Sequence, residues 1–284
     1  MYDAGMALDP IVTASQLAAL LPRRRGELAL FDCRPEEPAY RAGHIEGAIH
    51  AQLERDLSAP PPDPARGGRH PLPSVCDFCE RLGGWGVTPD THVVAYDDQK
   101  GANAAARLWW MLRALGHDAV QVVDGGLPTL VAAGLRVTTE VPAPQPAPPY
   151  PARQWQSPLV DIGEVDRARL DPDRRVIDVR AAFRYRGESE PIDPIAGHIP
   201  GARSAPLTDN LQADGSFKTA DDLRALYRGV LEGVPPERAI VHCGSGVTAC
   251  HTLLALERAG LPGAKLYVGS WSEWCRNPER ARTP

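Results

Sequence analysis

Short apolar runs alternate with segments of helical periodicity along most of the chain. Residues 239–241 (AIV) are typical of a buried strand, and a helical pattern follows from 247 to 260. In residues 74–83 the apolar side chains fall at positions i, i+3, i+4 and i+7 of one helix face, and Ser74 is placed to cap that helix. Strands that alternate with helices in this way predict an α/β fold, in which helices cover a mostly parallel sheet.

The pattern occurs twice. The matching pairs of segments are 28–34 (LALFDCR) with 175–180 (RVIDVR), 43–48 with 197–202 (both Gly-His-Ile-x-Gly-Ala), 92–116 with 239–260, and 122–126 with 267–271. The separation along the chain is nearly the same for every pair except the second, which implies a short insertion in the second copy. Two copies of this length can each close a hydrophobic core, so the sequence predicts a duplicated α/β unit.

A proline-rich stretch separates the two copies. Six of the ten residues from 142 to 151 are proline, so this stretch can form neither a helix nor a central strand. We expect an extended, semi-rigid connector, with a first domain over residues 1–141, a linker over 142–156 and a second domain over 157–284. A second stretch rich in proline and glycine, residues 59–73, interrupts the first copy, and long loops inside a domain are usually functional or disordered.

The composition is that of a soluble globular protein, with 43% hydrophobic residues, 24% charged residues and a net charge of −5. This mild acidity argues against non-specific binding to nucleic acid or to an anionic membrane. No apolar run is long enough to span a bilayer and the N-terminus does not resemble a secretory signal, so we expect a cytoplasmic location. The six cysteines do not indicate a disulfide scaffold. Cys76 and Cys79 form a CxxC pair without a second pair or matched histidines, so we expect a structural helix position and no metal site.

Cys243 stands out among the cysteines. It ends the apolar run and is followed by Gly244, Ser245 and Gly246 before the helical pattern begins. A strand-to-helix turn of this kind directs backbone N–H groups and the positive end of a helix to one point, where they stabilise a thiolate and bind an anion. The alternative is a buried structural cysteine, but two glycines favour a backbone that closes around a ligand. The first copy has Asp97 at the equivalent position, so we expect it to be a scaffold and one wall of an inter-domain cleft.

These segments resemble the two-domain rhodanese family, which comprises thiosulfate and 3-mercaptopyruvate sulfurtransferases. The resemblance rests on CGSGVTAC at 243–250, the two GHIxGA elements, VVDGGL at 122–127 and SWSEW at 270–274, and it covers nearly the whole chain. It implies tandem rhodanese-like α/β domains, of which only the second is catalytic. It also implies a sulfurtransferase, for which we expect no metal and no organic cofactor.

By this resemblance Cys243 is the nucleophile that takes up sulfane sulfur as a persulfide. The residues that would hold the persulfide follow it: Gly244, Ser245, Gly246, Val247 and Thr248. Arg184 corresponds to the arginine that binds the donor's anionic group. His70 and Glu54 correspond to a histidine and an acidic residue that handle protons together with the loop serine in mercaptopyruvate-type members. Asp56 is an alternative to Glu54.

The chain departs from the mercaptopyruvate type at one place. Those members carry a second arginine shortly after the first, and residues 188–195 (ESEPIDPI) contain none. Arg186 is a candidate substitute, because residues i and i+2 of an extended backbone share a face. Gly244 and Ser245 are similar to the mercaptopyruvate-type loop, whereas thiosulfate-type members tend to carry basic residues there. The preferred donor therefore stays open.

The chemistry is a thiolate displacement at sulfur followed by transfer to a second substrate, which is a double displacement. The partners implied are a small anionic sulfur donor and a thiol or cyanide acceptor, or a thioredoxin-like protein. For Asp32 and Asp178 we expect turn carboxylates. For the Trp109–Trp110 and Trp271–Trp274 pairs we expect packing in the core or between domains.

A cysteine at the head of such a loop also suggests two other classes of protein. A phosphatase of the Cys-x5-Arg type needs an arginine at position 249 to hold the phosphoryl group, and the chain has Ala249 there. A non-enzymatic persulfide carrier or interaction module is the remaining alternative. The intact cysteine loop favours an enzyme.

Overall fold

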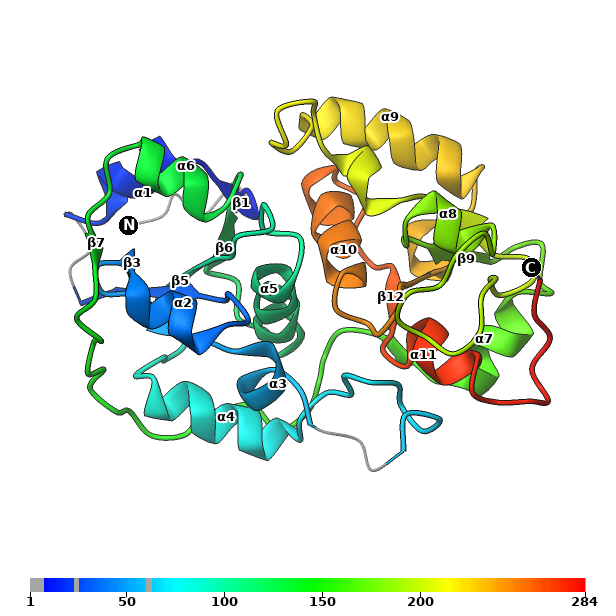
Figure 1. Cartoon of the computed structure of the whole chain (residues 1–284), viewed down its shortest axis with the longest axis horizontal. Helices are drawn as coiled ribbons and strands as arrows, with labels where there is room; N and C mark the ends of the chain where they lie inside the picture. The colour runs from blue at the N-terminus through cyan, green and yellow to red at the C-terminus, as the bar shows by residue number, and fades with distance from the viewer. Residues whose placement is uncertain (1–7, 23–25, 60–62, 284) are drawn as a thin grey trace.

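The computed structural model describes residues 8–22, 26–59 and 63–283. These residues form two halves, each built on a five-stranded sheet (Figure 1). The first half contains β1 (Ile11–Val12), α1 (Ala14–Leu20), β2 (Leu28–Asp32), α2 (Glu37–Ala42), β3 (His44–Ile45), β4 (Ile49–His50), α3 (Leu53–Asp56), α4 (Val75–Gly84), β5 (His92–Tyr96), α5 (Ala104–Ala114), β6 (Val120–Val123), α6 (Leu127–Ala132) and β7 (Val137–Thr138). The second half contains β8 (Leu159–Val160), α7 (Ile162–Ala168), β9 (Arg175–Asp178), α8 (Ala182–Tyr185), β10 (Arg203–Ser204), η1 (Leu207–Asn210), α9 (Ala220–Leu231), η2 (Pro236–Arg238), β11 (Ala239–His242), α10 (Ala249–Arg258), β12 (Lys265–Tyr267) and α11 (Ser270–Trp274).

The two sheets have the same topology. Their strand orders are β1-β6-β5-β2-β4 and β8-β12-β11-β9-β10, and every neighbouring pair in both sheets is parallel. The strands β5 and β11 lie at the centre and are buried along their length, which explains their unbroken apolar sequences. The predicted duplication of a mostly parallel α/β unit is confirmed.

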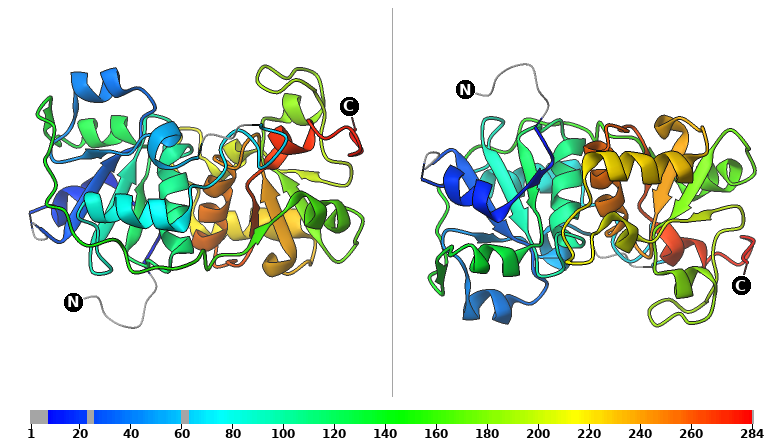
Figure 2. Two further views of the ribbon diagram at one scale, coloured as in Figure 1. Left: turned by 90° about the horizontal axis from the view of Figure 1, so that it is seen from below. Right: turned by 90° about the horizontal axis from the view of Figure 1, so that it is seen from above.

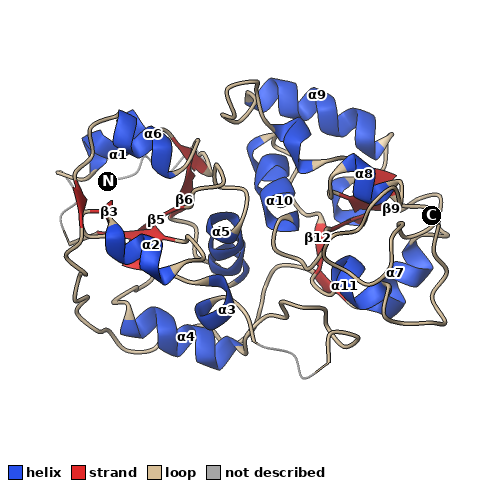
Figure 3. Ribbon diagram, viewed as in Figure 1, coloured by secondary structure: helices blue, strands red, loops and turns tan. Residues whose placement is uncertain are grey.

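Helices cover both faces of each sheet, as Figure 3 shows. Side chains that alternate along β2 and β5 divide between two cores: Leu30 and Val94 pack with α1 and α6, while Phe31 and Val93 pack with α4 and α5. The second sheet is covered in the same way by α7 and α11 on one face and by α9 and α10 on the other.

The elements predicted from local pattern form close to their predicted places. The helix expected at 74–83 is α4, and the Ser74 hydroxyl accepts a hydrogen bond from the Asp77 N–H at 3.1 Å. The strand expected at 239–241 is β11, and the helix expected from 247 is α10, which begins at Ala249. Cys79 is buried on the inner face of α4 and Cys76 is exposed, so the CxxC pair occupies ordinary helix positions.

The halves dock through α5 and α10, which lie between the two sheets in Figure 1. Every residue of α5 except Arg113 is buried, because one side of the helix faces its own sheet and the other faces α10. Trp109 and Trp110 belong to this shared core, and Trp271 and Trp274 are buried in the core beside α7. The expectation of core and interface packing for these tryptophans is confirmed.

The proline-rich segment is extended, but it is held against the first half. The N–H of Ala147 donates to the Gly83 carbonyl at 2.8 Å, and the N–H of Tyr150 donates to the Cys79 carbonyl at 3.0 Å. The segment therefore binds along α4 as a strap. The boundaries 1–141, 142–156 and 157–284 stay a prediction.

The strap makes a prediction about two neighbouring glycines at the end of α4. A Cβ atom at Gly83 would lie 2.7 Å from the Pro148 carbonyl oxygen, whereas a Cβ at Gly84 would meet nothing within 4 Å. We expect Gly83→Ala to lower the free energy of unfolding by about 1–3 kcal/mol through overpacking. The matched control Gly84→Ala should be neutral or stabilising by up to about 1 kcal/mol. Urea and thermal unfolding measure both; equal stability of the two variants would contradict the strap.

Candidate active site

Cys243 follows the central strand β11 directly and is 1% exposed. Its N–H donates to the Ser270 hydroxyl at 3.2 Å, and its carbonyl accepts from the Trp271 N–H at 3.0 Å. These bonds fix the residue between β11 and the start of α11. The thiol therefore lies at the bottom of its loop and not on the open surface.

The loop after Cys243 presents a run of backbone donors. Within the described residues, the N–H groups of 244–248 have no hydrogen-bond acceptor in the chain. Gly246 has a φ of 75°, and a Cβ atom there would lie 2.5 Å from the Val268 carbonyl oxygen, so the loop can close only with glycine at this position. Successive amides without acceptors in a loop form an anion-binding nest.

The equivalent loop of the first half, which follows Asp97, has a side chain inside its nest. At the position equivalent to Cys243, the Asp97 carboxylate accepts hydrogen bonds from the N–H groups of Gln99, Gly101, Asn103 and Ala105, at 2.9, 2.7, 3.1 and 3.3 Å. The first three donors correspond, by the same separation along the chain, to Ser245, Val247 and Ala249 of the second half. Burial raises the pKa of Asp97, against the opposing effect of these amides. A carboxyl group that accepts from four amides thus occupies the nest of the first half.

His70, Ser245 and Glu54 lie together. The His70 Nδ1 is 2.7 Å from the Ser245 hydroxyl oxygen, and its Nε2 is 2.8 Å from a Glu54 carboxylate oxygen. Because a carboxylate only accepts, Nε2 carries the ring hydrogen in neutral His70, and Nδ1 accepts from the serine. Burial lowers the pKa of His70, against the opposing effect of Glu54. Asp56, the alternative to Glu54, is held instead by Arg55 and Arg81.

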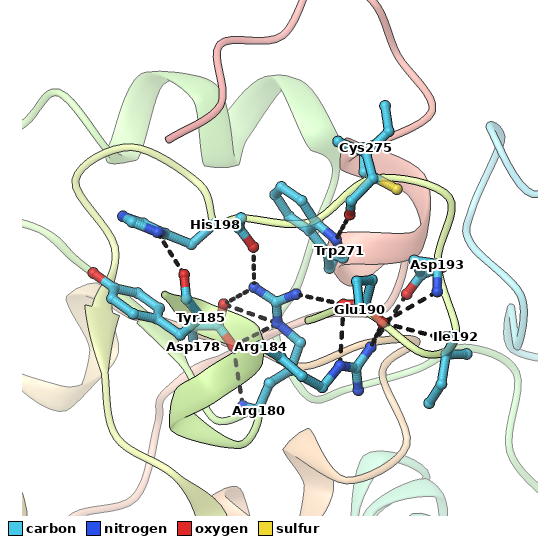
Figure 4. A network of polar contacts seen from close by, with 12 residues as sticks. Asp178, Arg180, Arg184, Tyr185, Glu190, Ile192, Asp193, His198, Trp271 and Cys275 are labelled. Carbon is cyan, nitrogen blue, oxygen red and sulfur yellow. Dashed lines mark hydrogen bonds and ion pairs between the residues drawn. The ribbon is translucent and has the colours of Figure 1, made fainter. Parts of the chain in front are cut away.

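Arg184 and the acidic residues after α8 form a buried network (Figure 4). The Nε and Nη2 atoms of Arg184 donate to the two Glu190 carboxylate oxygens at 3.0 and 2.7 Å, and Nη2 lies 3.5 Å from Asp193. Arg184 therefore forms an ion pair with Glu190, and this pair is mostly buried. The guanidinium also lies beside the Cys243 loop, because a Cβ at Gly244 would be 3.4 and 3.5 Å from its terminal nitrogens.

Arg69 also lies at this loop, although no pattern in the sequence pointed to it. This residue precedes His70 in the loop that joins α3 to α4, and its Nη2 would lie 3.5 Å from the same Cβ position at Gly244. The loop extends beneath α11 of the second half in Figure 1 and beside it in the left view of Figure 2. The Gly67 N–H donates to Glu273 at 2.9 Å, and Asn277 donates to the Ala65 carbonyl at 3.1 Å. The first half therefore delivers two polar side chains, His70 and Arg69, to the cysteine loop.

The expectation for Arg186 is wrong. It required an extended backbone, but residues 182–185 form the short helix α8 and Arg186 follows its last turn. Residues two apart on a helix point to different sides. Arg186 pairs with Glu188 at 2.5 Å, and both side chains are exposed. It does not share the face of Arg184.

A second missed residue is Arg107, which α5 buries completely at the domain interface. Its Nη1 donates to the Gly246 carbonyl and its Nη2 donates to the His70 carbonyl, both at 3.0 Å. Burial lowers the pKa of Arg107, while the nearby thiols of Cys250 and Cys243 oppose this effect. Arg107 therefore connects the cysteine loop to the backbone of the histidine.

Asp178 behaves as the structural carboxylate that was expected. It accepts from the Arg180 N–H at 3.0 Å, and Arg180 Nη2 also donates to the Gly197 carbonyl at 2.7 Å (Figure 4). Asp32 and Arg34 repeat these contacts in the first half, where Arg34 Nη2 donates to the Gly43 carbonyl at 2.7 Å. The buried ion pair in each half is a feature that the turn prediction did not include.

Among residues 8–22, 26–59 and 63–283, no group of three His, Cys, Asp or Glu side chains is arranged to hold a metal ion. Over the same part of the chain, no helix combines the length and the apolar character that crossing a membrane requires.

Comparison with known proteins agrees with this architecture. The family model for the rhodanese-like domain matches residues 13–133 and, a second time, residues 161–277. A Pseudomonas aeruginosa protein named "Probable 3-mercaptopyruvate sulfurtransferase" is 44% identical over 283 residues, which cover 97% of this chain and 98% of that protein. Rat thiosulfate sulfurtransferase is 34% identical over 249 residues, which cover 86% of this chain and 81% of that protein. The crystal structure of SseA from Escherichia coli, described as a 3-mercaptopyruvate sulfotransferase, has a TM-score of 0.74 at 32% identity and covers 94% of this chain and 100% of that chain.

Two α/β domains of one topology, with a cysteine loop in the second and an acidic counterpart in the first, define a tandem-domain protein of the rhodanese fold. The chain belongs to the rhodanese family. It is a sulfurtransferase, an enzyme that takes sulfur from a donor and passes it to a thiophilic acceptor. The resemblance drawn from the sequence motifs is thereby confirmed.

The glycine of the loop gives a prediction for the enzyme. Gly246→Ala places a Cβ against the Val268 carbonyl, and it puts an L side chain on the left-handed backbone of this position, which costs roughly 1–2 kcal/mol by itself. We expect sulfurtransferase activity to fall about 100-fold, since a displacement of about 1 Å in a catalytic loop has such an effect. Gly229→Ala is the control, because a Cβ at Gly229 on α9 meets nothing within 4 Å. Wild-type activity of Gly246→Ala would refute the tight loop.

Proposed function

We propose that the protein moves sulfane sulfur from 3-mercaptopyruvate or thiosulfate, through a persulfide on Cys243, to a thiophilic acceptor. The observation that carries this proposal comes from the equivalent loop of the first half. There the Asp97 carboxylate accepts hydrogen bonds from four backbone N–H groups. A persulfide places an anionic atom two bonds beyond Cβ, as a carboxylate does. The amides of residues 244–248 suit that atom. The names of the relatives supply the two donors.

In the first half-reaction the Cys243 thiolate attacks the sulfur of the donor. A new S–S bond forms and the bond between that sulfur and the rest of the donor breaks. With thiosulfate, the electron pair leaves on sulfite. With mercaptopyruvate, the C–S electron pair leaves as the enolate of pyruvate, which takes up one proton.

The histidine cluster suits mercaptopyruvate in particular. That donor arrives with a thiol proton, and its enolate needs a proton before it departs as pyruvate. Ser245 and neutral His70 accept the thiol proton and return it to the enolate, while Glu54 orients the ring through Nε2. Thiosulfate has no such proton and its leaving group needs none. We therefore infer that 3-mercaptopyruvate is the preferred donor.

In the second half-reaction the acceptor attacks the outer sulfur. The S–S bond breaks and its electron pair returns to Cys243, which regenerates the thiolate. Cyanide, a small dithiol or a thioredoxin-like protein are acceptors of the required chemistry. All six cysteines are free, which suits a reducing compartment and the expected cytoplasmic location.

The persulfide is tested by intact-mass measurement. Wild-type protein incubated with mercaptopyruvate is expected to gain the mass of one sulfur atom and to lose it on addition of cyanide. Cys243→Ser should gain none, because the serine hydroxyl cannot hold sulfane sulfur. Cys76→Ser is the control, since Cys76 is the exposed cysteine and lies on α4. An adduct that persists in Cys243→Ser would contradict the assignment, and an adduct without turnover would identify a carrier instead of an enzyme.

The proton role of His70 is tested by a pH profile. The pKa of His70 lies below 6.5, so the ring is neutral at pH 7 and becomes protonated only at lower pH. We expect kcat/KM for mercaptopyruvate to fall on the acid side with an apparent pKa below 6.5, because protonated Nδ1 cannot accept from Ser245. His70→Gln should lower kcat by about 10²–10⁴ and remove this acid limb.

The thiosulfate profile is the internal control for the pH experiment. It should lack the limb that depends on His70, because that donor brings no proton. An identical acid limb in the wild type and in His70→Gln would assign the titration to another group.

A further inference from the structure

Arg107 is part of a closed circuit of contacts that includes His70 and Ser245. Its Nη2 donates to the His70 carbonyl and its Nη1 donates to the Gly246 carbonyl, each at 3.0 Å. Gly246 follows Ser245 in the chain, and the His70 ring lies 2.7 Å from the Ser245 hydroxyl oxygen. The circuit therefore runs from the guanidinium to His70, across to Ser245, and back through Gly246 to the same guanidinium.

The circuit joins two halves that meet at an interface. His70 lies in the loop between α3 and α4 of the first half, and Ser245 lies in the loop between β11 and α10 of the second half. Among the described residues, no backbone N–H donates to the His70 carbonyl, so the bond from Arg107 is what holds it. The helix α5 thus fixes the backbone of the histidine and the backbone beside the serine from a single side chain.

Only a guanidinium suits this position. Two carbonyls from different halves need two donors at a fixed spacing, which the planar fork of arginine supplies and the ammonium of lysine does not. Arg107 is fully buried, and in the described part of the chain no carboxylate pairs with it. A methionine would avoid the free energy that burial of a charge costs, but it would leave both carbonyls without a donor.

The charge of Arg107 also acts on the His70 ring. The groups that face this ring are Glu54 from α3, Arg69 from the same loop, Arg107 from α5 and the uncharged Ser245 hydroxyl from the second half. Burial lowers the pKa of His70, Glu54 opposes this effect, and the two arginines add to the lowering. Removal of the positive charge at position 107 is therefore expected to raise the pKa of His70.

We propose that Arg107 is a positioning residue of the reaction, which keeps the His70 ring within hydrogen-bond distance of Ser245 by bridging the two halves. It acts through these two residues and does not touch the sulfur donor. The inference rests on the proposed function, because it assigns Arg107 to the proton transfer that mercaptopyruvate needs and thiosulfate does not. The docking of the two halves thus sets the geometry of one chemical step.

The test compares Arg107→Lys with Arg113→Lys on the same helix. Arg113 also reaches across the interface, where it donates to Glu257 of α10 at 3.1 Å, but its carboxylate partners lie outside the cysteine loop. Both substitutions keep the charge, and only the first removes the bridge. With cyanide as acceptor, Arg107→Lys should lower kcat for mercaptopyruvate by about 10- to 100-fold, as a misplaced proton-transfer group does. Arg113→Lys should match the wild type.

The comparison of donors separates positioning from a general structural role. Because thiosulfate needs no proton transfer, the loss of kcat in Arg107→Lys should be at least about 10-fold larger with mercaptopyruvate than with thiosulfate. A loosened interface would slow both donors equally. Equal losses with the two donors would therefore overturn the proposal.

A double-mutant cycle with His70→Gln shows whether Arg107 acts through the histidine. In the His70→Gln background, Arg107→Lys should change kcat for mercaptopyruvate by less than about threefold, since residues that act as a unit are not additive. The same loss in both backgrounds would contradict a role that is exerted through His70.

A titration of the His70 ring by NMR keeps the test independent of turnover, with the signal assigned by its loss in His70→Gln. We expect the midpoint to rise in Arg107→Met and to stay unchanged in Arg113→Met. If the wild type transfers no sulfur, the proposed function fails, while a rise confined to Arg107→Met still supports the bridge. An unchanged midpoint in folded Arg107→Met would overturn it. Thermal unfolding establishes that each variant is folded, and if Arg107→Met is not, the kinetic comparison with Arg107→Lys decides.

Discussion

The half of the molecule that carries the cysteine loop depends on a buried cation that it does not itself contain. Arg107 lies in the middle of α5, fully buried, and donates to the carbonyls of Gly246 and His70. Within the described residues no carboxylate pairs with it, so the desolvation of the guanidinium is offset by backbone carbonyls and by the two nearby thiols. Such an arrangement is stable only while α5 and α10 remain in contact. The cysteine loop and the histidine are therefore held in register by the docking of the two halves.

This dependence gives the first half a role in the structure, although its loop carries Asp97 where the second half has Cys243. The equivalent loop of the first half has the same form, but there the Asp97 carboxylate lies inside the nest and accepts hydrogen bonds from its backbone N–H groups. The loop of the second half carries the shorter thiol side chain of Cys243 at that position. The N–H groups of residues 244–248 therefore remain available to an added anion. The first half contributes α5 and residues 63–73 as a support, and the second half carries the cysteine loop.

Much of this architecture could be predicted from local sequence, and the rest could not, for a physical reason. The strand before Cys243, the helix capped by Ser74 and the duplication follow from periodicity and repeats, which are short-range signals. The group of Glu54, His70 and Ser245 came from resemblance to a family, because no local pattern joins positions 175 residues apart. Arg69, Arg107 and Asp193 were missed, since their contacts cross the domain interface. Arg107 did leave a signal: a lone charge in the otherwise apolar centre of AAARLWWMLRA must find a buried partner. Arg186 was misplaced because a helix of four residues was taken for an extended backbone.

The carboxylates beside the Cys243 loop fix the arginines that surround them. Asp178, Glu190 and Asp193 pair with Arg69, Arg180, Arg184 and Arg276, so four guanidinium groups face three carboxylates. Without these carboxylates, four long cations close together would repel one another and disperse into solvent. With them, the guanidinium groups are held in fixed places and one positive charge remains in excess. Guanidinium donors fixed in this way are already oriented, so little free energy would be needed to reorganise them around an anion. The acidic residues thus hold an excess of positive charge in one fixed arrangement of guanidinium groups.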